Sequence, residues 1–421
     1  MDENLKFIQT AVLIMISAFL NFDALAIDRV RSQALAEKLI QSVRAVRFDQ
    51  VVDFGPNDGL CPGSSTCTHP APSISAMPNI DLAVMVLEDG KPPEVAANVL
   101  FSRDFPEGKI ATLSDDFSVT DIRFRRWNID RWNGKKGWDQ NPPLTQADDI
   151  VPTSEDTTPK KSDYMSPYPA STFKLMVAFY LMKLAEQGEI QIADIQSDLD
   201  AMITRSDNEA TQRLIRWLHR NSKMKPLNEY LKNLGLSTLQ INGTDPDRRS
   251  WNPGEIHMTA MDTVRLLRLI DGPLLQLLSE QAFHEALSTG GLCGMDGWTP
   301  GIPAIFPNRW IDPQAGLITT PERARGRNPS SCNASASVEF LHKTGLTYNY
   351  SSDAGIVKDR QNPGKRYIVA WFSNLGYRYA DPQWANTEIL PCFAPGLQLC
   401  VTRKAGDLGN RIHQAIQEAL R

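Results

Sequence analysis

The sequence lacks the features that mark several large classes of protein. It has no excess of one charge, because its 44 lysines and arginines nearly balance its 49 aspartates and glutamates, for a net charge of −5. We therefore expect neither a nucleic acid nor an acidic membrane surface as a partner. Internal repeats and collagen-like patterns are absent, although 28 prolines and 26 glycines are present. With 42% hydrophobic residues, the 421 residues should fold as two or three globular domains or as one elaborated domain.

Motifs that hold metal ions are also missing from the sequence. Neither C-x-x-C nor H-E-x-x-H occurs, and the six histidines lie far apart. We therefore expect no metal site and no other cofactor, and we assign the six cysteines to disulfides. Spacing alone leaves their pairing open. Only because they are nearest in sequence, the preferred pairs are Cys61–Cys67, Cys293–Cys332 and Cys392–Cys400.

The N-terminus carries a pattern typical of export. Residues Phe7–Leu20 are mostly apolar, and Ala24-Leu25-Ala26 follows as an A-x-A cleavage site. The apolar run is too short and too often interrupted by polar residues for a good membrane span. We predict a signal peptide over residues 1–26 and a mature chain over 27–421 in the periplasm or outside the cell. An uncleaved anchor is the alternative.

Hydrophobic periodicity predicts an α+β chain with strands on both sides of a helical middle. Helical spacing of apolar residues indicates helices over Arg29–Phe48 and Asp407–Leu420, and helices should dominate from Ser171 to about Ser288. The polar, proline-rich stretch Trp138–Ser162 reads as a surface insertion. Strands are predicted over Asp81–Leu87, Asn98–Arg103, Glu339–His342, Ala354–Val357 and Tyr367–Phe372.

The first candidate catalytic motif is S-x-x-K, formed by Ser171 and Lys174 ahead of the apolar run Leu175–Leu184. Residues three apart share one face of a helix, so the lysine would lie beside the hydroxyl. A serine hydroxyl needs a proton acceptor before it attacks, and burial can lower the pKa of a lysine enough to supply a free amine. A capping serine beside an exposed lysine is the plainer interpretation of this motif taken alone.

Two further motifs carry polar groups at the ends of predicted elements. Ser206-Asp207-Asn208 lies between helical stretches, where a hydroxyl and an amide could relay a proton and hold a substrate amide. Lys343-Thr344-Gly345 follows an apolar strand, where a cation and a hydroxyl could bind a carboxylate and glycine would allow close backbone approach. Singly, an N-cap and an ordinary strand end explain these residues more simply.

Together, the three motifs resemble a known family. S-x-x-K opening a helix, S-D-N between helices and K-T-G on a late strand is the motif set of class A β-lactamases and penicillin-binding proteins. The sequence is similar to this superfamily from about Asp81 to the C-terminus, as a class A β-lactamase-like serine hydrolase. Neighbouring residues agree over 169–174, 202–211 and 252–266.

The resemblance implies a β-lactamase/transpeptidase-like fold within a single hydrolase domain over 27–421. It would consist of an antiparallel sheet flanked by helices and a mostly helical subdomain over about 166–290. A long surface insertion would occupy about 104–165. The active site would lie where the sheet meets the helical subdomain.

The resemblance also implies a role for each motif residue. Ser171 would be the nucleophile that forms the acyl ester, Lys174 its proton partner and Ser206 the relay to the leaving nitrogen. Backbone N–H groups of Ser171 and Leu346 would form the oxyanion hole. The substrate would be held by Asn208, Lys343, Thr344 and Gly345.

One part of the family pattern is missing. Class A enzymes hold a glutamate in E-x-x-L-N that activates the deacylating water, and no such motif occurs where the sequence reads Ile241–Asp247. Asp245, which precedes Pro246, could take that place. A turn-forming Asp-Pro is the plainer alternative.

A basic, aromatic stretch lies outside the family motifs, and it could hold a glycan strand or an acidic wall polymer. Its alternative role is an inserted hairpin that packs its tryptophans on the core and exposes its arginines. The residues are Arg123, Arg125, Arg126, Trp127, Arg131 and Trp132.

The function implied by the resemblance is that of an exported serine acyl-hydrolase, most simply a β-lactamase of the kind that gives antibiotic resistance. A D-alanyl-D-alanine peptidase, or a penicillin-binding sensor protein with little turnover, is the alternative. The partner would be a small-molecule β-lactam or a peptidoglycan stem peptide, bound by a monomer with no stable membrane span after signal cleavage. A non-covalent wall-binding module would not need all three motifs.

Overall fold

The computed structural model describes most of the hydrolase region. The predicted signal peptide and all six cysteines lie outside the described residues, so neither the cleavage nor the disulfide prediction is tested by the structure. No helix in the described part of the chain is long and apolar enough to cross a membrane. The described residues are 27–53, 73–74, 76–126, 149–151, 161–204, 206–247, 251–270, 338–347, 349–359, 362, 364–376, 379–380 and 402–419.

The centre of the fold is a six-stranded antiparallel sheet in the order β10-β11-β12-β3-β4-β5. Early and late strands meet in it, because Ile80 pairs with Ser373 where β3 lies against β12. The α+β prediction is therefore confirmed, and five of the six strands fall where the sequence predicted them. The strands are β3 (Ile80–Glu88), β4 (Ala96–Phe101), β5 (Lys109–Ile110), β10 (Val338–Leu346), β11 (Ser351–Asp359) and β12 (Lys365–Ser373).

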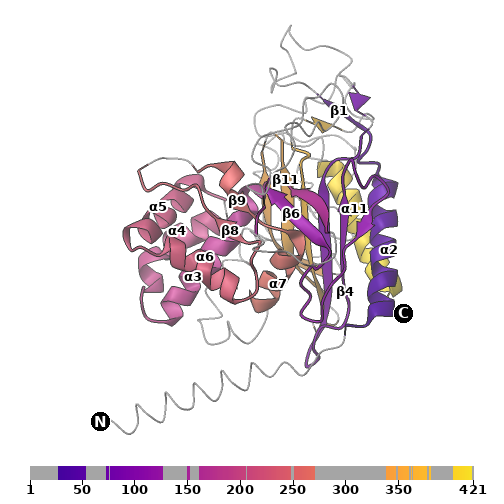
Figure 1. Ribbon diagram of the computed structural model, residues 1–421. Coiled ribbons are helices and arrows are strands. Elements are labelled where there is room, and N and C mark those ends of the chain that lie inside the picture. The colour runs from indigo at the N-terminus through magenta and orange to yellow at the C-terminus, as the bar shows by residue number, and fades with distance from the viewer. Residues whose placement is uncertain are drawn as a thin grey trace, which may run out of the picture.

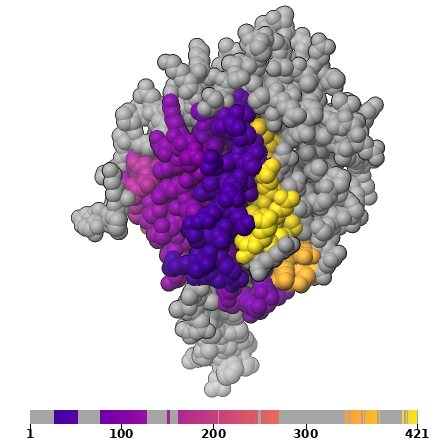
Figure 2. All heavy atoms as spheres, turned by 90° about the vertical axis from the view of Figure 1, so that its right-hand side faces the viewer, coloured from indigo at the N-terminus to yellow at the C-terminus, as the bar shows by residue number. Residues whose placement is uncertain are grey.

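Two terminal helices cover one face of this sheet (Figure 1). Helix α2 (Arg29–Val46) and helix α11 (Thr402–Ala419) lie side by side, and Figure 2 shows them together on that side of the molecule. Asp28 caps α2 by accepting a hydrogen bond from the Arg31 amide. The helices bury their apolar sides against alternate strand residues, including Val84, Val369 and Trp371.

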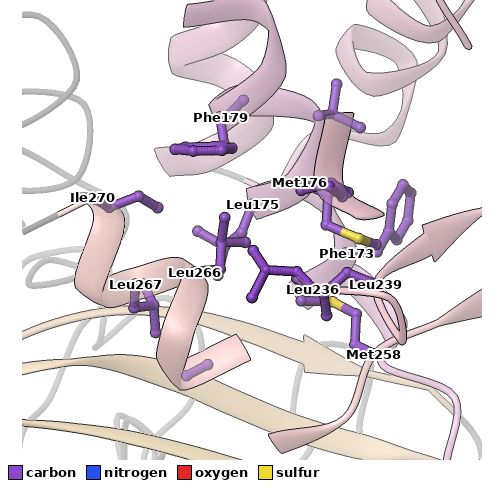
Figure 3. Close-up of a cluster of buried hydrophobic side chains, with 14 of the residues drawn as sticks. Phe173, Leu175, Met176, Phe179, Leu236, Leu239, Met258, Leu266, Leu267 and Ile270 are labelled. Carbon is purple, nitrogen blue, oxygen red and sulfur yellow. The ribbon is translucent and has the colours of Figure 1, made fainter. Parts of the chain in front are cut away.

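The other face of the sheet packs against the helical subdomain. Helix α3 runs through its centre, since ten of its thirteen residues are buried. Figure 3 shows Leu175 and Met176 of α3 near Leu266 of α7. The helices are α3 (Lys174–Glu186), α4 (Ile192–Thr204), α5 (Asn208–Arg220), α6 (Met224–Asn233) and α7 (Ala260–Ile270), preceded by the 3₁₀ helix η2 (Ala170–Phe173).

The region expected as a surface insertion over 104–165 is more structured than predicted. It contains β5 and also the parallel pair β6 (Ile122–Arg126) and β7 (Ser162–Ser166). Phe124 and Tyr164 from this pair are buried against each other at a ring distance of 6.1 Å. Part of the described region therefore contributes to a buried cluster, while other described residues, such as Glu107, Asp115 and Asp116, are exposed, and the surface insertion stays a prediction.

Short strands complete the described fold. Strands β1 (Val51–Asp53), β2 (Ser73–Ile74) and β13 (Tyr379–Ala380) form a separate small sheet. Strands β8 (Gln240–Ile241) and β9 (Ile256–His257) flank the loop that contains Asp245 and end next to the 3₁₀ helix η3 (Pro253–Glu255). None of these five strands was predicted, because runs of two or three residues carry too little periodicity to be recognised.

Candidate active site

Ser171 lies in η2, at the entrance to helix α3. The preceding Ala170 has a φ of 48°, so the chain turns sharply before the serine. This φ is uncommon for a residue with a side chain, and such local strain is typical of functional positions. The Ser171 side chain is partly exposed, and its hydroxyl has no hydrogen bond to any residue that the structure describes. It is therefore available to an incoming substrate.

Lys174 begins α3 three residues after Ser171, as the S-x-x-K spacing predicted, and its side chain is fully buried. Its Nζ donates to the Ser206 carbonyl at 2.7 Å, to Asn208 Oδ1 at 2.7 Å and contacts Ser206 Oγ at 3.2 Å. Burial lowers the pKa of Lys174 to about 7, against the opposing charge of Asp207. With a pKa near 7, the neutral amine is accessible at neutral pH, and the burial of Lys174 differs from the exposed lysine of the capping alternative.

The S-D-N motif joins α4 to α5, and its residues Ser206 and Asn208 contact the Lys174 amine. Ser206 has a φ of 54°, a left-handed conformation that turns the chain between the two helices. Asp207 is the N-cap of α5, where its carboxylate accepts from the Ala210 amide at 2.7 Å. The N-cap alternative is thus correct for Asp207, whereas Ser206 and Asn208 turn their oxygen atoms to the lysine.

The K-T-G motif lies on the edge strand β10 and completes the cluster. Lys343 Nζ donates to Ser206 Oγ at 2.9 Å and to the Thr344 carbonyl at 2.8 Å. Its side chain is only 2% exposed, and burial together with the charge of Lys174 lowers the pKa of Lys343 well below its usual value. Two lysines from distant parts of the sequence therefore converge on the single hydroxyl of Ser206.

Gly345 lets β10 touch the segment that carries the nucleophile. A Cβ at this position would lie 2.5 Å from the Pro169 carbonyl oxygen and 2.8 Å from the Ser171 amide nitrogen. Ser352, which pairs with Gly345 on β11, donates to the same Pro169 carbonyl at 2.5 Å. Glycine at this position therefore allows the backbone of β10 to lie close to the backbone of η2. Leu346, the second expected oxyanion donor, follows Gly345 directly in β10. The two expected donors, Ser171 and Leu346, therefore lie on two segments that contact each other, η2 and β10.

The donors and acceptors around the Lys174 amine determine which proton transfers this cluster allows. A neutral Lys174 amine has two hydrogens, and two of its neighbours, the Ser206 carbonyl and Asn208 Oδ1, can only accept. Its lone pair is then left to accept a proton from a hydroxyl, either Ser206 Oγ or a nucleophile. Ser206 in turn accepts from Lys343. The arrangement is thus one in which an amine, a hydroxyl and a second lysine are in hydrogen-bond contact and a proton could pass from one to the next.

The loop between β8 and β9 holds Asp245 in a turn beside the second half of α5. Asp245 Oδ1 accepts from the Asp247 amide at 2.8 Å, which closes the turn. Its neighbours Thr244 and Pro246 hydrogen-bond to His219 and Arg216 in the second half of α5. Arg216 follows Asn208 by eight residues, or about 12 Å along the helix. These contacts agree with the turn-forming alternative for Asp245, and a role at the acyl ester stays a prediction.

The described part of the basic, aromatic stretch makes structural contacts, but it does not form the expected hairpin, because β6 pairs in parallel with β7. Arg125 is 3% exposed and pairs with Asp149 at 3.0 Å and with Asp163 at 3.2 Å. Arg126 pairs with Glu255 at 2.9 Å. Arg125 is buried and Arg126 is partly buried, and their ion pairs join β6 to β7 and to neighbouring segments. The expectation that the arginines are exposed is therefore wrong for these two. Trp127, Arg131 and Trp132 lie outside the described residues.

Two further contacts around the site were not predicted. His342 Nδ1 lies 2.7 and 2.8 Å from the two carboxylate oxygens of Asp353, and both residues are buried. Trp251 donates its indole N–H to the Tyr168 hydroxyl at 2.7 Å and stacks edge-on against Phe173. The only sequence signal for the first pair was that His342 lies in a predicted strand and Asp353 directly precedes another.

No group of three or more histidines, cysteines, aspartates or glutamates among the described residues is arranged to hold a metal ion.

Comparison with known proteins agrees with this arrangement. Residues 193–387 match a family described as the Beta-lactamase enzyme family, a range that contains Ser206, Asn208 and Lys343 but begins after Lys174. No curated protein sequence matches the chain.

Similar solved structures include a class A β-lactamase from Bacteroides cellulosilyticus, 13% identical, with 90% of this chain and 99% of that chain covered and a TM-score of 0.40. A protein described as PBP-A is 17% identical, with 60% and 82% covered and a TM-score of 0.37. A β-lactamase from Streptosporangium roseum is 16% identical, with 60% and 85% covered and a TM-score of 0.36.

The family match covers the helical subdomain from α4 onward and the late strands. The structure brings α3 and the S-x-x-K segment, which lie before the matched range, into contact with them. Three motifs far apart in the sequence thus form one cluster in the arrangement that the resemblance implied. Through this region, the chain is similar to the Beta-lactamase enzyme family, which the β-lactamase/transpeptidase-like motif set of the sequence also resembles.

Proposed function

We propose that this protein is an exported, monomeric serine acyl-hydrolase that opens β-lactam rings through an acyl ester on Ser171. The observation that supports it is the fully buried Lys174, whose amine is held by two acceptors while its pKa falls to about 7. Such an amine can accept the proton of a serine hydroxyl at neutral pH, which an ordinary lysine cannot do. The cell compartment would be the periplasm or the exterior.

In the proposed reaction, the Lys174 amine takes the proton from Ser171 Oγ as that oxygen bonds to the carbonyl carbon. Negative charge on the carbonyl oxygen is stabilised by the amides of Ser171 and Leu346. When the carbon–nitrogen bond breaks, Ser206 gives its proton to the leaving nitrogen and regains one from Lys174. Lys343 and Thr344 would hold the carboxylate of the substrate, and Asn208 its amide.

A second candidate function is supported by the position of Asp245. Hydrolysis of the acyl ester needs a water that a base deprotonates, normally a carboxylate. Asp245 closes a turn beside the second half of α5. A D-alanyl-D-alanine peptidase, or a penicillin-binding protein with little turnover, would use the same acylation groups and need no such carboxylate in this loop.

The test is incubation with a chromogenic cephalosporin, followed by intact-mass measurement over time. Acylation predicts a mass increase that is lost in Ser171→Ala and kept in the matched control Ser197→Ala, an exposed serine on α4. Continued colour formation beyond one equivalent indicates a β-lactamase. A persistent adduct indicates the second candidate. No adduct with any β-lactam would contradict the substrate class.

A further inference from the structure

Two buried hydroxyl groups, to which the proposed reaction assigns no role, lie between the nucleophile segment and the sheet. Thr172 of η2 and Ser352 of β11 are both 0% exposed, and their hydroxyl oxygens are 2.7 Å apart. Ser352 Oγ also lies 2.5 Å from the carbonyl oxygen of Pro169, the residue before η2. These contacts join two parts of the chain that are 180 residues apart in the sequence.

The donors and acceptors determine the direction of this chain of hydrogen bonds. Both oxygen–oxygen distances are those of hydrogen bonds, so each contact must contain a hydrogen. A carbonyl oxygen can only accept, so the single hydroxyl hydrogen of Ser352 goes to Pro169. The Thr172 hydroxyl must then donate to Ser352 Oγ. The Thr172 amide donates to the same Pro169 carbonyl at 3.2 Å, so this carbonyl is held by two donors.

The carbonyl that is held in this way precedes the strained residue Ala170. A φ of 48° is costly for a residue with a Cβ, and it persists only where surrounding contacts hold the backbone. The two hydrogen bonds fix the plane of the peptide between Pro169 and Ala170. The next amide along the chain is that of Ser171. If the carbonyl were released, Ala170 could relax to an ordinary φ, and the Ser171 amide would rotate.

The other expected oxyanion donor, the Leu346 amide, points out of the sheet. In an antiparallel pair of strands, only alternate residues form hydrogen bonds with the partner strand. The Thr347 amide donates to the Tyr350 carbonyl at 2.8 Å. Leu346 is one residue earlier in β10, so its amide is directed away from β11, at the outer edge of the described sheet.

The Ser352 hydroxyl occupies the space that the missing side chain of Gly345 leaves. The two residues lie directly opposite each other on β10 and β11. A Cβ on Gly345 would collide with Ser352 Oγ and would lie 2.5 Å from the Pro169 carbonyl oxygen. The hydroxyl therefore links the edge of the sheet to η2 at a point where the two backbones approach closely.

We propose that Ser352, together with Thr172, is a positioning residue for the oxyanion hole. It holds the Pro169 carbonyl so that the Ser171 amide stays directed at the same oxygen atom as the Leu346 amide. This inference rests on the proposed function, because it concerns the acyl ester on Ser171. Negative charge on that oxygen develops only in the transition state, so Ser352 affects the rate of acylation and not the binding of the substrate.

The first test is Ser352→Ala, which removes the hydroxyl without adding bulk. The matched control is Ser351→Ala, because Ser351 is the neighbouring residue on β11, is 2% exposed and donates to the Leu375 carbonyl. In Ser352→Ala, the rate constant of acylation by a β-lactam should fall about 10- to 100-fold, with the dissociation constant unchanged. The control should acylate at the unaltered rate. Equal rates in the two variants, or a change confined to the dissociation constant, would overturn the proposal.

The infrared spectrum of the acyl ester provides a readout that a loss of stability alone does not move. Hydrogen bonds to a carbonyl oxygen weaken its double bond and lower its stretching frequency. In the Ser352→Ala adduct, this frequency should rise toward that of the same ester in unfolded protein. In the Ser351→Ala adduct, it should stay in place. An unmoved frequency in Ser352→Ala would contradict the proposal.

Thr172 provides a rescue and a test of coupling, which also applies if Ser352→Ala does not fold. Thr172→Ser keeps the hydroxyl and should acylate near the unaltered rate, whereas Thr172→Val keeps the shape without the hydroxyl and should be slower. Because the two hydroxyls form one chain of hydrogen bonds, the double variant Thr172→Val/Ser352→Ala should be no slower than Ser352→Ala. Equal rates for Thr172→Ser and Thr172→Val, or effects that multiply in the double variant, would overturn the proposal.

Crystal structures of the ligand-free variants separate this inference from the proposed function. Ala170 should keep its positive φ in Ser351→Ala and lose it in Ser352→Ala. A positive φ that persists in Ser352→Ala would overturn the inference, whether or not any β-lactam reacts. The expected change at Ala170, in a protein whose unaltered form gives no adduct at Ser171, would count against the proposed function alone.

Discussion

Among single side chains, Lys174 carries the strongest prediction. Lys174→Arg keeps the positive charge but cannot supply a neutral amine, so acylation should fall by about 10²–10⁴-fold. The pKa of Lys174 is lowered to about 7, so the unaltered protein should also acylate more slowly as the pH falls through 7 and the amine becomes protonated. Stopped-flow acylation across pH checks both. Near-normal rates in Lys174→Arg would remove this lysine from the mechanism.

Asp245 gives an opposite prediction for a single side chain. Because its carboxylate closes the turn with the Asp247 amide, Asp245→Asn should leave the lifetime of the acyl ester unchanged. Intact-mass measurement of adduct decay checks this result. A lifetime that lengthens by 10²-fold or more would show that the loop brings Asp245 to the ester during reaction.

The sequence predicted the candidate acylation residues, because each belongs to a motif of three or four consecutive residues. It could not reach the His342–Asp353 pair, since two residues eleven apart become neighbours only through the register of β10 and β11. The sequence left two alternatives open for Asp245, a catalytic carboxylate and a turn-forming residue. Residue types alone do not determine the direction in which a loop points.

Among the helices and strands, the contact between β10 and η2 is the most sensitive to change. In Gly345→Ala, the new methyl group would lie within 3 Å of two backbone atoms, Pro169 O and Ser171 N, which cannot rotate away. We expect β10 to be displaced from the nucleophile, with acylation reduced at least about 10-fold and the melting temperature lowered. Gly364→Ala is the matched control, because its nearest neighbour is a side-chain atom of Asp89 at 3.3 Å. Equal effects of the two substitutions would contradict this account.

The elements themselves were predicted unevenly, for physical reasons. Strands β3 and β12 are recognised from apolar runs such as Tyr367–Phe372, since both faces of these strands are covered by helices. Strand β6 was missed because three of its five residues are arginines, which usually indicate a solvated segment. Arg125 is buried only because Asp149 and Asp163, distant in sequence, neutralise it.

For the whole molecule, export and the formation of disulfide bonds remain predictions from the sequence. The apolar run before Ala26 and the even number of cysteines predict that protein purified from the cell envelope begins near Ile27. They also predict no free thiols after denaturation. N-terminal sequencing and thiol titration measure these two properties. A chain that keeps Met1 and shows six titratable thiols would contradict both.

The pairing of β3 with β12 has a consequence for how the chain is made. Ile80 and Ser373 meet in the middle of the sheet, so nearly the whole chain must be synthesised before these central strands can join. Such non-local pairing slows folding and leaves apolar surface uncovered on the partly made chain. The helices of residues 171–270 can form earlier, but Lys343 arrives only with the late strands. An unfinished chain therefore has Ser171 and Lys174 without Lys343. The proposed acylation of Ser171 should begin only after the late strands have folded.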